Sequence, residues 1–141
     1  MTKQFIGTKI VTAWADTKDG KDGYAVKYAD GYTSWSPKDV FEDAYRVIEG
    51  DDQALIFGDA LVMLEAGKRM ARAGWNGKGM FVYLVPAASY PVQTGAAKAH
   101  FGEGSMVPYN AYFAIKNVDD TVSTWVPSVN DCLAEDWHVV E

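Results

Sequence analysis

The segment RAGWNGK places an arginine, a tryptophan, an asparagine and a lysine within seven residues, as Arg72, Trp75, Asn76 and Lys78. An indole offers a flat apolar face, and the other three side chains offer hydrogen-bond donors. This combination suits a nucleotide, whose base stacks and whose phosphates accept hydrogen bonds. Two other roles stay open, because a tryptophan that opens a strand is more often core or interface, and an arginine can cover a sheet with its aliphatic stem.

Residue types that support catalysis or metal binding do not form a recognisable pattern elsewhere. His100 and His138 are the two histidines, and neither has metal-ligand spacing with another histidine, cysteine or carboxylate. Cys132 is predicted to be a buried small apolar residue in a turn, and no serine lies in a nucleophile-elbow pattern. Glu135 and Asp136 are interpreted as a solvated acidic turn. We therefore expect no catalytic residue, no metal site, no cofactor and no enzymatic activity.

Size and charge limit the class of protein. A chain of 141 residues with 48% apolar residues can bury a core. The formal net charge of −6 argues against polymeric nucleic acid as a partner, although it allows a small anionic ligand. The sequence has no run of eighteen apolar residues and no signal-peptide pattern, which favours a soluble intracellular protein without membrane contact.

The elements around RAGWNGK follow from apolar spacing and glycines. Phe57, Leu61 and Leu64 recur at helical spacing, and Gly67 is placed to end the helix. Residues 68–72 are then expected to be extended, with a helix continuing to residue 73 as the alternative. A turn at 75–79 and an apolar strand at 80–85 follow.

The N-terminal residues 1–50 are predicted to form an accessory β-β-β-α module. Residues 10–15 read as a strand, 16–23 as a loop, and 24–35 as a hairpin around Asp30-Gly31. Ser36 is expected to cap a helix that follows, with Pro37 in its first turn.

Residues 57–141 are predicted to form the second domain. The stretch 87–108 lacks periodicity and is expected to be a long loop, either a lid or a mobile insertion. Strands at 110–116 and 121–126, a helical turn capped by Ser128 and Asp131, and a strand at 137–140 complete the chain. The predicted fold class is α+β, with small antiparallel sheets packed with short helices: the N-terminal β-β-β-α module, then a helix plus antiparallel β hairpins.

Two separated stretches together resemble the second Thoeris anti-defence family: FGDALVMLEAGKRMARAGWNGKGMFVYLVP at 57–86 and WVPSVNDCLAEDW at 125–137. The resemblance covers residues 57–141 and rests on RAGWNGKGM followed by the spacing W-x-P-S-x-x-D-x-L-A-x-D-W. The segment GYAVKYADGYTSWSPKDVFEDAYR looks like a small module that accompanies this family in phage proteins. The sequence departs from a minimal member in carrying this module and the long stretch 87–108.

The resemblance implies a phage-encoded sponge that acts in the cytoplasm of the infected bacterial host. Such proteins bind signalling nucleotides made by bacterial defence enzymes and sequester them without cleaving them. The Thoeris signal is glycocyclic ADP-ribose, and some members of the family also capture cyclic dinucleotides. Members are homo-oligomers, typically tetramers, with ligand pockets at subunit interfaces, so a homo-oligomer is expected here, with a tetramer favoured.

The resemblance also gives the candidate residues specific expected roles. The base of the signal would stack on Trp75 or Phe57, and Trp125 is a further aromatic candidate. Pyrophosphate oxygens would accept hydrogen bonds from donors at Arg72, Asn76 and Ser128. Asp131 would accept hydrogen bonds from ribose hydroxyls. Helix capping is an ordinary alternative for Ser128 and Asp131.

Two other classes of function stay open from the sequence. The first is an enzyme that degrades the same nucleotide signal. The second is a protein–protein interaction module in which the tyrosine and tryptophan surfaces bind a protein and no small ligand is involved.

Overall fold

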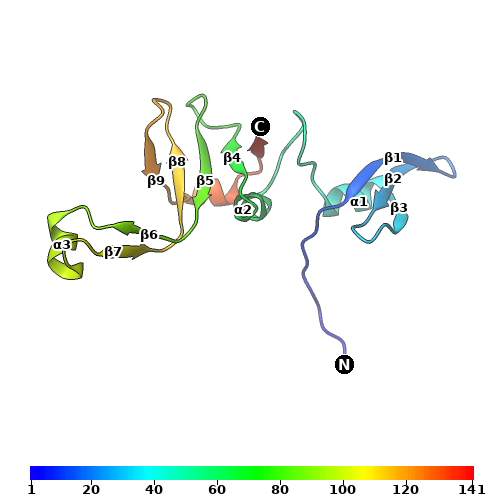
Figure 1. The fold of residues 1–141 in the computed structure, drawn as a ribbon. Helices are drawn as coiled ribbons and strands as arrows, with labels where there is room; N and C mark the ends of the chain where they lie inside the picture. The colour runs from blue at the N-terminus through cyan, green and yellow to red at the C-terminus, as the bar shows by residue number, and fades with distance from the viewer. The chain divides into compact units, whose positions relative to one another are not determined.

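Three antiparallel sheets and four short helices make up the computed structural model, which describes residues 1–141 (Figure 1). The chain divides into two units, Met1–Arg46 and Val47–Glu141. The predicted fold class, α+β with small antiparallel sheets and short helices, is confirmed. None of the helices has the length and apolar character needed to cross a membrane.

The first unit is a three-stranded sheet followed by one helix. Its strands lie in the order β1-β2-β3, and its elements are β1 (Thr12–Lys18), β2 (Lys21–Lys27), β3 (Thr33–Pro37) and α1 (Lys38–Ala44). Helix α1 packs on one face of the sheet, where the rings of Tyr24 and Phe41 stack with centroids 4.3 Å apart.

Two predictions for this unit were wrong in detail. The expected loop at 16–23 is a tight hairpin, because Asp19 and Gly20 both take positive φ (52° and 77°) and make a short turn between β1 and β2. Ser36 does not cap a helix, because β3 extends through Pro37 and no side chain caps α1. The hairpin turn predicted at Asp30-Gly31 is confirmed.

The second unit is built on a five-stranded antiparallel sheet. The strand order is β10-β4-β5-β8-β9, and the elements are α2 (Phe57–Glu65), β4 (Arg69–Arg72), β5 (Phe81–Val85), β8 (Tyr112–Lys116), β9 (Val122–Thr124), α4 (Val129–Leu133) and β10 (Trp137–Val140). Gly67 has φ 87° directly after α2, so the helix stops there and does not continue to residue 73. The chain therefore turns straight into β4.

The core of this unit lies between α2 and the sheet. It consists of fully or almost fully buried side chains: Leu55, Ala60, Met63, Leu64, Met70, Val82 and Trp137. Trp137 is completely buried at the start of β10, and Leu55 forms a single bridge with it just before α2. The helix near the start of this unit and the last strand of the chain thus both contribute side chains to one core.

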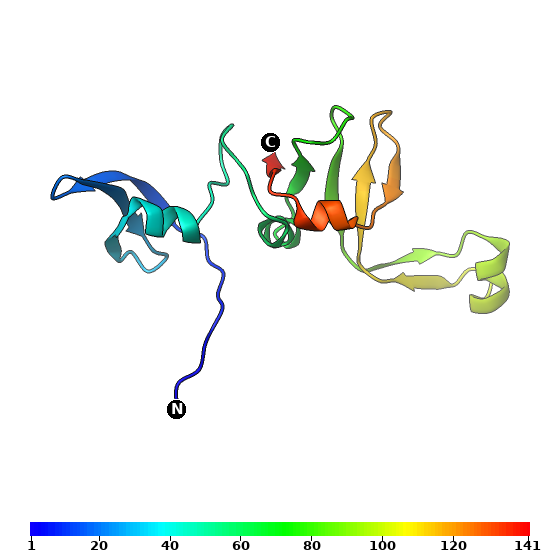
Figure 2. The same ribbon diagram turned by 180° about the vertical axis from the view of Figure 1, so that it is seen from behind.

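The expected loop at 87–108 has secondary structure of its own, so that prediction was wrong. Strands β6 (Ala88–Pro91) and β7 (Met106–Tyr109) pair as a two-stranded ribbon, and α3 (Gly95–Phe101) joins them. The Oγ atom of Thr94 caps α3 by accepting from the N–H of Ala97. Figure 2 shows this ribbon extending from the ends of β5 and β8. This segment is held by backbone pairing between β6 and β7 and by the cap of α3, neither of which produces an apolar periodicity in the sequence.

Candidate functional site

The pairing of β4 with β10 brings the two sequence motifs together. Arg72 stands opposite Trp137 in this pair, although 65 positions separate them in the chain. The N–H of Ala73 donates to the carbonyl of Asp136 at 3.0 Å, so the backbone pairing continues one residue past β4. The turn that follows β4 therefore lies beside the α4–β10 segment.

Helix α4 begins with a reciprocal capping box. The Oγ atom of Ser128 accepts from the backbone N–H of Asp131 at 3.1 Å. In return, Oδ2 of Asp131 accepts from the N–H of Ser128 and from its hydroxyl, both at 2.9 Å. The capping role predicted for these two residues is therefore confirmed.

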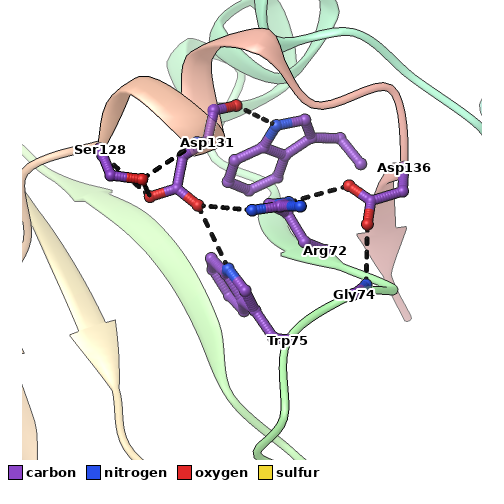
Figure 3. Close-up of polar contacts among 7 residues, drawn as sticks. Arg72, Gly74, Trp75, Ser128, Asp131 and Asp136 are labelled. Carbon is purple, nitrogen blue, oxygen red and sulfur yellow. Dashed lines mark hydrogen bonds and ion pairs between the residues drawn. The ribbon is translucent and has the colours of Figure 1, made fainter.

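Arg72 lies between two carboxylates, as Figure 3 shows. Its Nη1 donates to Oδ1 of Asp131 at 3.0 Å, and its Nε donates to Oδ1 of Asp136 at 2.9 Å. The second oxygen of Asp136 accepts from the N–H of Gly74 at 2.8 Å. The side chain of Arg72 is 19% exposed, so these charge-assisted bonds lie at the edge of the core.

The indole of Trp75 joins the same network through its N–H. Its Nε1 donates to Oδ1 of Asp131 at 3.3 Å, and Nε1 of Trp137 donates to the carbonyl of Asp131 at 2.9 Å. The carboxylate of Asp131 therefore accepts four hydrogen bonds, from Arg72, Trp75 and twice from Ser128. An ionised carboxylate has about four lone-pair positions, so its acceptor capacity is filled.

This network keeps both carboxylates ionised. Burial raises the pKa of Asp131, but hydrogen bonds from Ser128, Arg72 and Trp75 outweigh it, so the net pKa is lowered. The hydrogen bond from Arg72 is the main cause of a lowered pKa at Asp136. The pKa of Arg72 is raised in turn, mainly by its hydrogen bond to Asp136. A carboxylate with a lowered pKa and occupied lone pairs is a poor general base.

Four aromatic rings pack together beside the hydrogen-bond network of Arg72 and Asp131. Trp75 meets Trp137 edge to face with centroids 5.4 Å apart and meets Trp125 at 6.4 Å. The ring centroid of Phe57 lies 5.6 Å from that of Trp137 and 6.5 Å from that of Trp125. Trp75, Trp125 and Phe57 are each only partly buried. The aromatic cluster is thus Phe57, Trp75, Trp125 and Trp137, with Trp137 fully buried and three rings partly open to solvent.

The structure brings six of the seven predicted site residues into one contact network. The six are Phe57, Arg72, Trp75, Trp125, Ser128 and Asp131. Asn76 follows Trp75 in the chain, is exposed, and has no side-chain hydrogen-bond partner. The Nη2 atom of Arg72 also donates to no protein acceptor. These two groups are donors of the site that have no protein acceptor.

Two residues of this region differ from the predictions made for them from the sequence. Asp136 is not part of a solvated turn, because it pairs with Arg72 and with the N–H of Gly74. Only the pairing of β4 with β10 places it there, and no spacing in the sequence indicates that pairing. Cys132 is exposed and not buried. Asp131 turns inward at the preceding position of α4, which directs Cys132 outward.

Comparison with known proteins gives two matches. A family model described as the Thoeris anti-defense 2-like domain matches residues 55–140. A protein named Thoeris anti-defense 2, from Bacillus phage SP01, is 40% identical over 85 residues, which are 60% of this chain and 92% of that protein. The matched range of the family model contains all seven predicted site residues and β4, α4 and β10, which position them.

Proposed function

The chain belongs to the Thoeris anti-defence 2-like family, and we propose that it binds and sequesters a cyclic nucleotide immune signal without cleaving it. The proposed signal is glycocyclic ADP-ribose of the Thoeris system, with cyclic dinucleotides as possible further ligands. The proposed site of action is the cytoplasm of the infected bacterial host. Family membership is the main support for the anti-defence role.

The main structural support for the proposed site is that the side chains of Arg72 and Trp75 both donate to Oδ1 of Asp131. A partly open indole offers a stacking face for a base, which is typically worth about 1–3 kcal/mol. Nη2 of Arg72 and the side-chain amide of Asn76 are donors without protein acceptors, and they suit a pyrophosphate. Trp125 and Phe57 extend the aromatic surface beside Trp75.

We propose positioning roles for Asp131 and Ser128 in this site. The carboxylate of Asp131 already accepts four hydrogen bonds, so a ribose hydroxyl would have to displace one of them. Its contacts instead fix the orientation of the Arg72 guanidinium and the Trp75 indole. Ser128 in turn orients Asp131. A fixed donor and a fixed ring lose less conformational entropy when a ligand binds.

Sequestration, rather than turnover, is favoured by the electrostatics of the site. The two carboxylates nearest the rings have lowered pKa values and are held by Arg72. They are therefore ionised, and the acceptor positions of Asp131 are filled, which makes them weak candidates for proton transfer. A sponge must also compete with the signal receptor, which requires nanomolar affinity, about −12 kcal/mol. We propose that a homo-oligomer, with a tetramer favoured, buries the ligand between subunits to reach it.

Calorimetric titration of the full chain tests the proposal, with glycocyclic ADP-ribose, linear ADP-ribose and a cyclic dinucleotide as separate ligands. Each complex is then heat-denatured and the released nucleotide is identified by chromatography. Nanomolar binding with intact ligand supports a sponge. Recovery of a cleaved product would make the protein an enzyme. No binding of any of the three ligands contradicts the proposal and leaves a protein–protein interaction module.

A further inference from the structure

The first unit exposes a sheet face that carries two tryptophans. In the three-stranded register, Ala25 of β2 lies between Trp14 of β1 and Trp35 of β3. Residues directly opposite each other share a face of the sheet, so both indoles stand on the side of Ala25. Helix α1 covers the other side, because Phe41 stacks on Tyr24 and Glu42 accepts from the hydroxyl of Tyr24 at 2.6 Å.

A glycine of β2 lets one of the two indoles lie against this face. The ring of Trp35 occupies the space that a side chain at position 23 would need, so Gly23 is required beneath it. The indole Nε1 of Trp35 donates to the carbonyl of Asp16 at 3.2 Å, which fixes the ring across the sheet. Trp14 is 49% exposed and has no hydrogen bond or ring contact. The unit therefore presents one fixed and one free indole.

Basic residues are concentrated on the same face. Lys18 and Lys21 stand opposite each other, and Lys27 is two positions beyond Ala25, so all three share the face of the tryptophans. The ammonium group of Lys18 lies 5.8 Å from the centroid of the Trp35 ring. Among the strand residues on this face, Asp16 is the single acidic one. The helix side carries the acidic residues Asp22, Asp39, Glu42 and Asp43.

The net charge of the whole chain conceals this distribution. Residues 1–46 contain equal numbers of acidic and basic residues, so the full net charge of −6 belongs to residues 47–141. The total charge of −6 therefore does not exclude nucleic acid as a partner of the first unit, which is neutral and has its charges separated between two faces.

We propose that the Trp14–Trp35 face of the first unit binds single-stranded nucleic acid. The indoles lie on strands separated by one strand, so they are anchored about 9.5 Å apart. A base can stack on the free ring of Trp14, and a second base on Trp35 would take the place of the Lys18 ammonium group. Lys18, Lys21 and Lys27 lie beside them, where phosphates of the same strand would pass. This inference is independent of the sponge function proposed for the second unit.

Fluorescence anisotropy of the full chain with labelled oligonucleotides tests this proposal. The probes are a short oligothymidylate, the matching oligouridylate, and a duplex of the same length. We expect both single strands to bind and the duplex to bind at least about tenfold more weakly, because its bases are already stacked. Neutralising three phosphates predicts a slope of log affinity against log salt of about −2.

Matched variants separate this face from general surface charge. Trp14→Ala should weaken oligothymidylate binding by about fivefold to a hundredfold, and a thermal melt of the variant checks that the first unit stays folded. Lys27→Gln should reduce the salt slope by about 0.7, while Lys38→Gln, at the start of α1 on the other side of the sheet, should leave it unchanged.

Three results would overturn the proposal. They are the absence of binding at low salt, equal binding of duplex and single strand, and an affinity that Trp14→Ala leaves unaltered. If an acidic peptide binds in place of the oligonucleotides and Trp14→Ala abolishes that binding, the face recognises protein and the proposal is wrong. Because the Thoeris signal binds the other unit in our proposal, calorimetry with glycocyclic ADP-ribose should be unaffected by Trp14→Ala.

Discussion

The Nη1 atom of Arg72 lies 3.0 Å from Oδ1 of Asp131, which joins the end of β4 to the first turn of α4 across 59 positions of the chain. The side chains are 19% and 11% exposed, so solvent screens this pair less than a surface ion pair. The same carboxylate holds the indole N–H of Trp75. Removing either partner therefore affects both the fold and the proposed stacking surface.

Arg72→Gln should lower the free energy of unfolding by about 2–4 kcal/mol, because it leaves the partly buried carboxylates of Asp131 and Asp136 without their cation. Urea unfolding followed by tryptophan fluorescence measures this change. Lys116→Gln is the matched control, because its partner Asp120 is 86% exposed and the pair should contribute less than about 1 kcal/mol. Equal losses in the two variants would contradict the structural role of Arg72.

The stability of the second unit should fall in acid. The pKa values of Asp131 and Asp136 are lower in the folded protein than in the unfolded chain, so the unfolded chain binds more protons as the pH falls. Their contribution is fully present above the unfolded pKa of about 4 and is lost as the pH falls through the lowered folded values. Urea unfolding between about pH 6 and pH 3 should show this decrease.

Asp136→Asn should flatten that acid dependence. Asp119→Asn is the comparison. The pKa of Asp119 is also lowered, chiefly by hydrogen bonds from Thr121, but this carboxylate lies in an exposed turn, so its substitution should flatten the acid dependence less. A slope that only Asp119→Asn changes would show that the Arg72 network does not govern acid stability.

Substitution of Trp75 should separate packing from ligand binding. Trp75→Phe keeps a ring against Trp137 but removes the hydrogen bond to Asp131, so we expect about 1 kcal/mol of lost stability and ligand binding weakened by less than about tenfold. Trp75→Ala removes the stacking face and should weaken binding more than tenfold. Calorimetry and thermal melts measure both effects. If Trp75→Ala binds the ligand as well as Trp75→Phe does, Trp75 has no ligand role, and a large loss of stability in Trp75→Ala alone would identify it as a core residue.

Cys132 should react with a thiol reagent in the native protein. It is exposed on α4 beside Leu133, which is 76% exposed. The rate of labelling without denaturant should approach the rate in urea. Full protection would indicate that another copy of the chain covers α4, which size-exclusion chromatography with light scattering would then detect.

Gly23→Ala should destabilise the first unit, because the new methyl group would overlap the Trp35 ring and the carbonyl of Ser36. Overpacking of this kind typically costs about 1–3 kcal/mol. Gly7→Ala is the control, since no atom lies within 4 Å of its added methyl group. Proteolysis followed by mass spectrometry should show faster cleavage within residues 12–37 in Gly23→Ala alone.

Local chemistry let the sequence predict much of this protein. Helical spacing from Phe57 to Leu64, the glycine at 67 and the capping residues Ser128 and Asp131 act within a few residues of each other, and the structure has the corresponding helices. The two motifs also identified the family, because their order and spacing are recorded in the chain itself. The extents of β1 and of the β6–β7 ribbon were missed, because strand pairing and a two-residue turn determine them.

The tertiary structure decided which groups meet. Arg72 and Asp131 were predicted to be separate ligand contacts and Asp136 to be solvated, whereas the β4–β10 pairing and the position of α4 make them one ion-paired network. Cys132 points outward because Asp131, its neighbour in α4, points inward. Trp14 and Trp35 share one face because of the register of their strands with β2. Long-range contacts of this kind depend on how elements pack, and the spacing of residues within each element carries no record of it.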